Sequence, residues 1–200
     1  VPYFLFVLTT ERTWRLILGT FLFAIPYCMA EGAPFFHLAG TWWTKGSTIL
    51  GMPSMVAYPI GIFSIALAAA LFYLLPLAVC LPLKRRERFS PIVFALAFAL
   101  ADYLRAMILF GGYTFGTMGY ALIETTYLKH VASLTSVFGL TFIAVLCGAW
   151  CALFVYHLLM KQGNLMTRIR TLSVSGWEKR ETVLVALIFL SAFIFGVERE

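Results

Sequence analysis

The sequence predicts an all-α fold: a polytopic transmembrane helix bundle with five full spans and a partial N-terminal one. Two observations predict this fold class, the composition and the alternation of positive charge between long apolar stretches. Of the 200 residues, 62% are hydrophobic and 12% are charged, and the mean hydropathy is +0.91. Soluble domains carry roughly 25% charged residues. The nine carboxylates and fifteen Lys and Arg of this chain are therefore too few to furnish the surface of a soluble domain.

Apolar stretches follow one another along the chain. A helix needs about 20 mostly apolar residues to cross a hydrocarbon core of about 30 Å. Residues 1–8 form a half-length stretch that is too short to span. The five full spans that we predict are residues 14–30, 55–82, 91–110, 131–160 and 182–197. They make residues 1–200 a single transmembrane domain, and we expect no soluble catalytic domain within the chain.

Local helix chemistry marks two of these spans. We expect Ser90 to cap the third full span, with Pro91 at the first helical position, where its missing N–H costs nothing. Pro59 and Pro76 lie inside the second full span and should kink it. Neighbouring helices or Ser64 would then satisfy the carbonyls that the prolines free.

The lysines and arginines between the spans predict which way the helices run, because cytoplasmic loops retain positive charge. In chain order, the six groups of these cations outside the spans or at their ends contain two, one, four, one, five and one. Eleven therefore fall on one side and three on the other, and Arg105 lies within a span. This alternation places Arg12 and Arg15 in the cytoplasm and the C-terminus on the opposite side. Topology thus explains the net charge of +6, and we expect no nucleic-acid partner.

Four cysteines lie in or beside the apolar stretches. Cys147 and Cys151 share one helical face, but no His or carboxylate accompanies them at the spacing of metal ligands. We interpret these two, together with Cys28 and Cys80, as small apolar packing residues. We expect no metal site and no other cofactor.

Asp102 and Arg105 form a charged pair within the third full span, where inserting a charge near the helix centre costs about 2.5 to 3.5 kcal/mol. Their spacing of three residues puts both on one helical face. Two interpretations stay open. The pair either orients its helix as an internal ion pair near the outer end of the span, or it faces a polar cavity and contacts a lipid headgroup or an incoming domain.

Two outer segments are rich in aromatic residues. Residues 110–120 contain four glycines and four aromatics, which is typical of either an ordinary outer loop with an aromatic belt or a shallow re-entrant loop lining a lipid-accessible pocket. Residues 31–54 contain His37 and two tryptophans, and we interpret this segment as interfacial. Although Glu31 lies near His37 in the chain, we interpret the histidine as a headgroup contact rather than a catalytic base.

Three motifs, in this order, resemble the membrane domain of the apolipoprotein N-acyltransferase family. They are D-Y-L-R at 102–105, G-G-Y-T-F-G-T-M-G-Y at 111–120 and L-T-S-V-F-G-L-T-F-I at 134–143. The family's series is approximately E-W-x-R, G-F-P-W-x-x-x-G-Y and G-V-Y-G-L-S-F. The chain departs from it at Asp102, Thr114 and Phe115, where the family has glutamate, proline and tryptophan. The candidate lipid or partner contacts that the resemblance marks are Asp102, Tyr103, Arg105, Gly112, Tyr113, Phe115, Gly119 and Tyr120.

The resemblance implies an enzyme of eight spans with a nitrilase-like domain held outside the cytoplasm, between the seventh and eighth spans. In that register, residues 1–8 are the end of the second span and the five full helices are the third to the seventh, so we expect a truncated version without the nitrilase-like domain. The implied location is the bacterial inner membrane, with a periplasmic C-terminus. The implied reaction is acyl transfer from a phospholipid to the N-terminal amine of a diacylated lipoprotein. Its catalytic Glu, Lys and Cys belong to the nitrilase-like domain, so we expect no catalytic residue in this chain.

Two functional hypotheses of different classes follow. The first is the membrane part of such an acyltransferase, inactive alone, whose partners are membrane phospholipid, lipoprotein acyl chains and a nitrilase-like domain. The second is a non-enzymatic membrane component of a conjugal-transfer or assembly system, because a related family of conjugal-transfer proteins joins a similar membrane part to a nitrilase-like domain.

Overall fold

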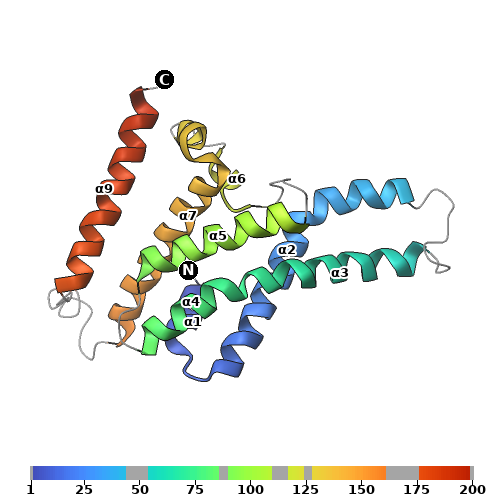
Figure 1. Ribbon diagram of the computed structural model, residues 1–200, viewed down its shortest axis with the longest axis horizontal. Helices are drawn as coiled ribbons and strands as arrows, with labels where there is room; N and C mark the ends of the chain where they lie inside the picture. Colours follow the sequence, from blue (N-terminus) through green and yellow to red (C-terminus); the bar gives the residue numbers. More distant parts are fainter. Residues whose placement is uncertain are drawn as a thin grey trace.

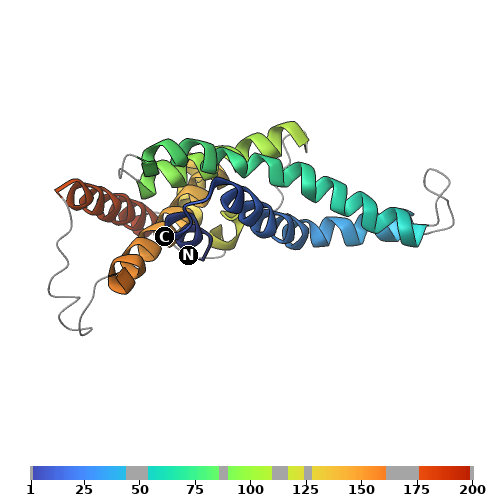
Figure 2. The ribbon, with the colours of Figure 1, turned by 90° about the horizontal axis from the view of Figure 1, so that it is seen from below.

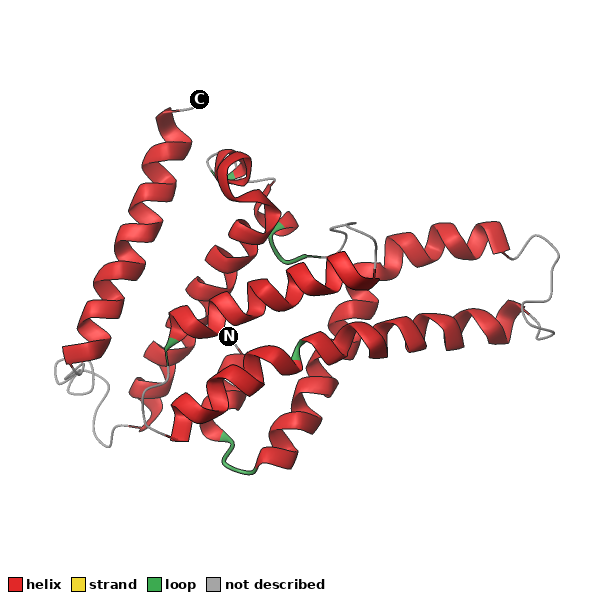
Figure 3. Ribbon diagram, viewed as in Figure 1, coloured by secondary structure: helices red, strands yellow, loops and turns green. Residues whose placement is uncertain are grey.

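The computed structural model describes residues 2–43, 54–85, 90–109, 117–123, 128–160 and 176–198. These residues are almost entirely helical and contain no strand (Figure 3), which confirms the predicted all-α fold. The helices are α1 (Pro2–Thr9), α2 (Thr13–Trp43), α3 (Ser54–Phe72), α4 (Leu74–Arg85), α5 (Pro91–Leu109), α6 (Tyr120–Ile123), α7 (Lys129–Met160) and α9 (Gly176–Glu198).

Within the described part of the chain, four helical regions are long and apolar enough to cross a membrane. The four regions are Thr13–Ala30, Pro59–Leu83, Pro91–Leu109 and Lys129–Tyr156. They coincide with the first four predicted full spans, and the chain is a membrane protein. The fifth predicted span corresponds to α9, in which a shorter apolar stretch, Thr182–Ala192, is found. A fifth span therefore stays a prediction.

The helices form a bundle in which α5 lies across α7 and beside α3 and α4 (Figure 1). Helices α2 and α3 run antiparallel and extend together away from the rest of the bundle (Figures 1 and 2). Among the described elements, α9 makes substantial contacts with α7 only. The main core thus lies where α1, α2, α3, α4, α5 and α7 meet.

The short helix α1 is inserted deeply into this core. Tyr3, Phe4 and Val7 are all buried, and the ring of Tyr3 stacks on that of Phe23 with their centroids 4.5 Å apart. The Tyr3 hydroxyl also forms a hydrogen bond of 2.9 Å with that of Thr20, so the polar end of the ring is satisfied within the core. Residues 2–8 are therefore a packed part of the bundle, although they are too short to span.

The predicted kink in the second full span occurs at Tyr73, which separates α3 from α4. Pro76 is the cause, because it has no N–H to donate to the carbonyl of Phe72, four residues earlier, where α3 ends. Pro59, by contrast, stays inside α3. The expectation that Ser64 satisfies a freed carbonyl is wrong: its hydroxyl donates to the carbonyl of Ile60 at 2.8 Å, and neither proline frees that group.

Two helix boundaries test the sequence analysis further. The cap at Ser90 is confirmed, since its hydroxyl accepts a hydrogen bond from the Val93 N–H at 3.3 Å and α5 begins at Pro91. The first full span, expected to end at residue 30, is followed by further helix to Trp43. Hydropathy marks where the apolar stretch stops, whereas backbone hydrogen bonding within a helix does not require apolar side chains. The side chains of Glu31 and His37 lie outside the described residues.

Candidate functional site

Helix α5 carries Asp102 and Arg105 into the interior of the bundle. Asp102 is fully buried and Arg105 is 3% exposed. Because the two residues are three apart on one helix, Nη2 of Arg105 lies 3.4 Å from Oδ1 of Asp102. The predicted ion pair is therefore present and faces inward, where each charge offsets the other in a setting of low polarity.

Tyr73, at the break between α3 and α4, completes this pair. Its hydroxyl donates a hydrogen bond to Oδ1 of Asp102, and its ring lies 5.8 Å from the guanidinium carbon of Arg105. Tyr73 is itself fully buried. Sequence reasoning missed this residue, although the expected kink around Pro76 was a signal that some side chain near the break could turn toward a neighbouring helix.

The short segment 117–119 covers one side of the charged pair. The backbone N–H of Met118 interacts with the Asp102 carboxylate, while Gly119 donates its N–H to the hydroxyl of Thr141 on α7 at 2.9 Å. A Cβ on Gly119 would overlap the Val137 carbonyl oxygen and lie 2.9 Å from the backbone nitrogen of Thr141. Only glycine allows the backbone to approach α7 this closely, so Gly119 holds the segment 117–119 against α7.

Helix α7 is interrupted where this segment meets it. Ser136 has φ 62° and ψ −179°, a backbone region that non-glycine residues occupy at a cost of roughly 1–3 kcal/mol. Its hydroxyl accepts a hydrogen bond of 3.3 Å from the Phe138 N–H. One turn later, the Thr141 hydroxyl, which holds Gly119, donates to the Val137 carbonyl at 3.3 Å. The kink at Ser136 thus lies next to the point where Gly119 comes close to the Val137 carbonyl.

The eight predicted contact residues are of three kinds: buried, exposed, and outside the described residues. Asp102, Arg105 and Gly119 are buried together. Tyr103 and Tyr120 are 43% and 44% exposed, and the ring of Tyr103 packs edge-on against Phe138 at 5.3 Å. The remaining three, Gly112, Tyr113 and Phe115, lie outside the described residues. The described residues of the three motifs therefore meet at one place, although the side chains of Tyr103 and Tyr120 are exposed.

This cluster holds polar atoms that are not fully used. Oδ2 of Asp102 and Oγ1 of Thr117 are buried and have no hydrogen-bond partner among the described residues. A buried polar atom without a partner costs roughly 1–3 kcal/mol. These two oxygen atoms therefore keep unused hydrogen-bonding capacity beside the Asp102–Arg105 pair. Nothing among the described residues forms a group of three His, Cys, Asp or Glu that could hold a metal ion.

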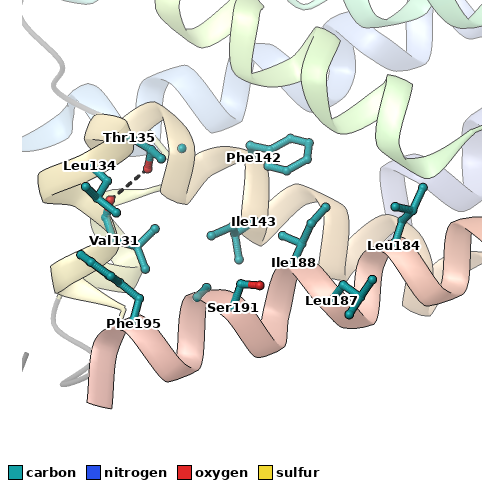
Figure 4. A pocket seen from close by; sticks show the side chains of 12 residues that line it. Val131, Leu134, Thr135, Phe142, Ile143, Leu184, Leu187, Ile188, Ser191 and Phe195 are labelled. Atoms are coloured by element: carbon teal, nitrogen blue, oxygen red, sulfur yellow. Dashed lines mark hydrogen bonds between the residues drawn. The ribbon is translucent and has the colours of Figure 1, made fainter. Parts of the chain in front are cut away.

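A large apolar hollow of about 600 Å³ lies between α7 and α9, close to the third motif (Figure 4). Phe142 and Ile143 project into it from α7, and Leu187 and Ser191 from α9 (Figure 4). Gly139 also lines it. The lining of this hollow is therefore almost entirely apolar.

The four cysteines have two different environments. Cys28 and Cys80 are buried in the core, as the packing interpretation predicts. Cys147 and Cys151 are exposed and line a second apolar hollow of about 360 Å³ between α7 and α9. The packing interpretation is therefore wrong for this pair, because α9 does not lie close enough to α7 to cover their shared face.

Comparison with known proteins identifies the family to which most of the chain is similar. No curated protein and no solved structure matches the chain. The family described as apolipoprotein N-acyltransferase N-terminal domain matches residues 1–150. This match includes α1 to α6, most of α7 and all three motifs that meet around Asp102. The chain therefore belongs to the family of apolipoprotein N-acyltransferase N-terminal domains.

Proposed function

We propose that this chain is the membrane-embedded part of an apolipoprotein N-acyltransferase-like protein, in which it binds phospholipid for the transfer of an acyl chain to a lipoprotein. The observation that carries the proposal is the convergence of the three family motifs on one buried polar cluster, Tyr73, Asp102 and Arg105, under the 117–119 segment. A guanidinium held in this way suits the phosphate of a phospholipid headgroup.

The acyl-transfer reaction requires catalytic groups in addition to this membrane bundle. Acyl transfer needs an activated nucleophile with a base within hydrogen-bond reach. Cys28 and Cys80 are enclosed by apolar core residues, and Cys147 and Cys151 face an apolar hollow. We propose that the nucleophile and its partners are supplied by a nitrilase-like domain, and that the 200 residues alone transfer no acyl group.

Purified chain, a phospholipid donor and a diacylated lipoprotein peptide test this proposal. We expect no N-acylated peptide from the chain alone, and retention of phospholipid that falls when Arg105 is replaced by Gln. Met107→Gln is the matched control, because Met107 is exposed on the same helix, 42% by area. N-acylation by the chain alone that is lost on replacing any cysteine would refute the proposal that a nitrilase-like domain supplies the nucleophile. Equal phospholipid retention by the Arg105 and Met107 variants would favour the non-enzymatic conjugal-transfer or assembly function instead.

The proposed setting is the bacterial inner membrane, with Arg12 and Arg15 in the cytoplasm and the C-terminus in the periplasm. The support is the distribution of Lys and Arg between the apolar stretches. Reporter fusions test it: an exported reporter should be active after Glu200 and a cytoplasmic reporter after Arg88. The reverse pattern would refute the orientation.

A further inference from the structure

A polar hollow lies at the turn between α1 and α2, away from the motif cluster. Its volume is about 390 Å³ and it is lined by Phe6, Thr9, Thr10, Glu11, Arg12 and Arg15. This turn lies at the end of the bundle opposite to α6 (Figure 1). This hollow is consequently separate from the site proposed around Asp102.

Arg12 and Arg15 bring two positive charges to this hollow. Arg12 and Arg15 are both exposed, and they are three residues apart at the start of α2, where the Arg15 N–H donates to the Arg12 carbonyl at 3.0 Å. Neither arginine forms an ion pair with a carboxylate in the part of the chain that the structure describes. Glu11 is the single acidic residue of the lining. The hollow therefore has a net positive charge.

The position of these arginines on α2 is unfavourable without an anion. The first turn of α2 contains no acidic residue, and the aligned peptide dipoles make the beginning of a helix positive. Two cations at this end add to that potential instead of offsetting it. An anion between Arg12 and Arg15 would relieve the repulsion and accept hydrogen bonds from both guanidinium groups.

The membrane setting identifies the kind of anion. The apolar span of α2 begins at Thr13, so the arginines lie at the edge of the hydrocarbon core. Trp14 is 58% exposed beside Arg15, whose guanidinium carbon lies 5.4 Å from the indole ring centre, as is usual at the level of lipid headgroups.

An exposed apolar strip continues from Arg15 into the membrane. Leu18 and Leu22, three and seven residues after Arg15, share its helical face and are 51% and 68% exposed. At about 1.5 Å per residue, they lie roughly 5 and 10 Å deeper along the helix. A charged group at the arginines that carries an acyl chain would have its chain beside these leucines, whereas a free phosphate would leave the strip unused.

We propose that the α1–α2 hollow binds the headgroup of an anionic phospholipid in the leaflet where α2 begins. The lipid phosphate lies between Arg12 and Arg15, Phe6 contacts the glycerol region, and one acyl chain follows Leu18 and Leu22. Basic pockets between spanning helices on the cytoplasmic side are known to bind acidic headgroups. The function of this lipid is to hold the α1–α2 turn at the membrane surface.

Lipid binding by the full chain in detergent tests the proposal, with phosphatidylglycerol, phosphatidylcholine and inorganic phosphate as the three probes. We expect the double variant Arg12→Gln/Arg15→Gln to weaken phosphatidylglycerol binding by about 25-fold, since one basic residue near an acidic surface contributes about fivefold. Arg180→Gln is the matched control, because Arg180 is also exposed near the start of its helix, and it should change binding less than twofold. Replacing both arginines by Lys should restore most of the binding.

A second measurement separates binding from folding. The helical content and the unfolding midpoint of the Gln double variant should match those of the parent, because both side chains are exposed. Three results would overturn the proposal: equal binding of phosphatidylcholine and phosphatidylglycerol by the parent, displacement of the lipid by inorganic phosphate at equal concentration, or a folded double variant that binds phosphatidylglycerol like the parent.

Discussion

Removing one member of the Asp102–Arg105 pair should destabilise the bundle more than removing both. Each side chain is at most 3% exposed, and the two are 3.4 Å apart. Breaking a buried ion pair on one side leaves the other charge uncompensated, which costs about 3–5 kcal/mol. We therefore expect Asp102→Ala and Arg105→Ala each to lower the free energy of unfolding by that amount.

The double replacement by Leu removes both charges and fills part of the space. Its remaining cost is the acceptor that the Tyr73 hydroxyl and the Met118 N–H lose, about 1–3 kcal/mol for each buried donor. Adding Tyr73→Phe to the double variant removes that hydroxyl as well. The triple variant should therefore be at least as stable as the double one and clearly more stable than either single variant.

Denaturant unfolding of the purified protein in detergent, followed by helical circular dichroism, measures these differences. Met107→Ala, an exposed position on the same helix, is the control and should cost less than about 1 kcal/mol. If the two single variants and the double variant all unfold like the parent, the pair is solvated and has no structural role. If the double variant loses as much as the two single variants added together, the charges are not coupled and the explanation is wrong.

Three further predictions concern the contacts of α7. Gly119→Ala should lower the free energy of unfolding by about 1–3 kcal/mol, because the added Cβ overlaps the Val137 carbonyl. Gly61→Ala is the control and should be neutral or stabilising in the same unfolding assay, because a Cβ there meets nothing within 4 Å. Ser136→Val should lower the unfolding midpoint more than Ser136→Gly, because a branched side chain at φ 62° is strained and glycine is not; equal midpoints would contradict the kink. An apolar maleimide should label Cys147 and Cys151 in the folded protein faster than the buried Cys28 and Cys80, as peptide mass spectrometry can measure, and uniform labelling would mean that α9 covers the pair.

The candidate site was predictable in part. Asp102 and Arg105 were found because two charges in an apolar span stand out, and their spacing of three residues places them on one helical face whatever the surroundings. Tyr73 and Thr141 were missed because their contacts join residues 29 and 22 positions apart. Such contacts depend on how α4, α5 and α7 cross, and periodicity within one helix carries no information about crossing geometry.

Hydropathy also leaves the inward face of a spanning helix undecided. Helix α3 is apolar all round, so no polar side distinguishes its two faces. In the structure, its small residues Ala66, Ala69 and Ala70 are buried, whereas the larger Leu67 and Leu71 are 40% and 54% exposed. In lipid there is no hydrophobic gain from turning leucine inward, and small residues allow the helix backbones to approach closely.

The sequence by itself determined that this protein is a helical membrane bundle, where its main apolar helices lie, and that two charges share one face of the third span. Each of these follows from composition or from neighbours along the chain. Only the tertiary structure decided that Tyr73 turns from the Pro76 break to meet Asp102, that Gly119 fits against the kink at Ser136, and that Cys147 and Cys151 are left uncovered. The physical reason is that these features arise from close approach between different helices, which the packing of the whole bundle sets.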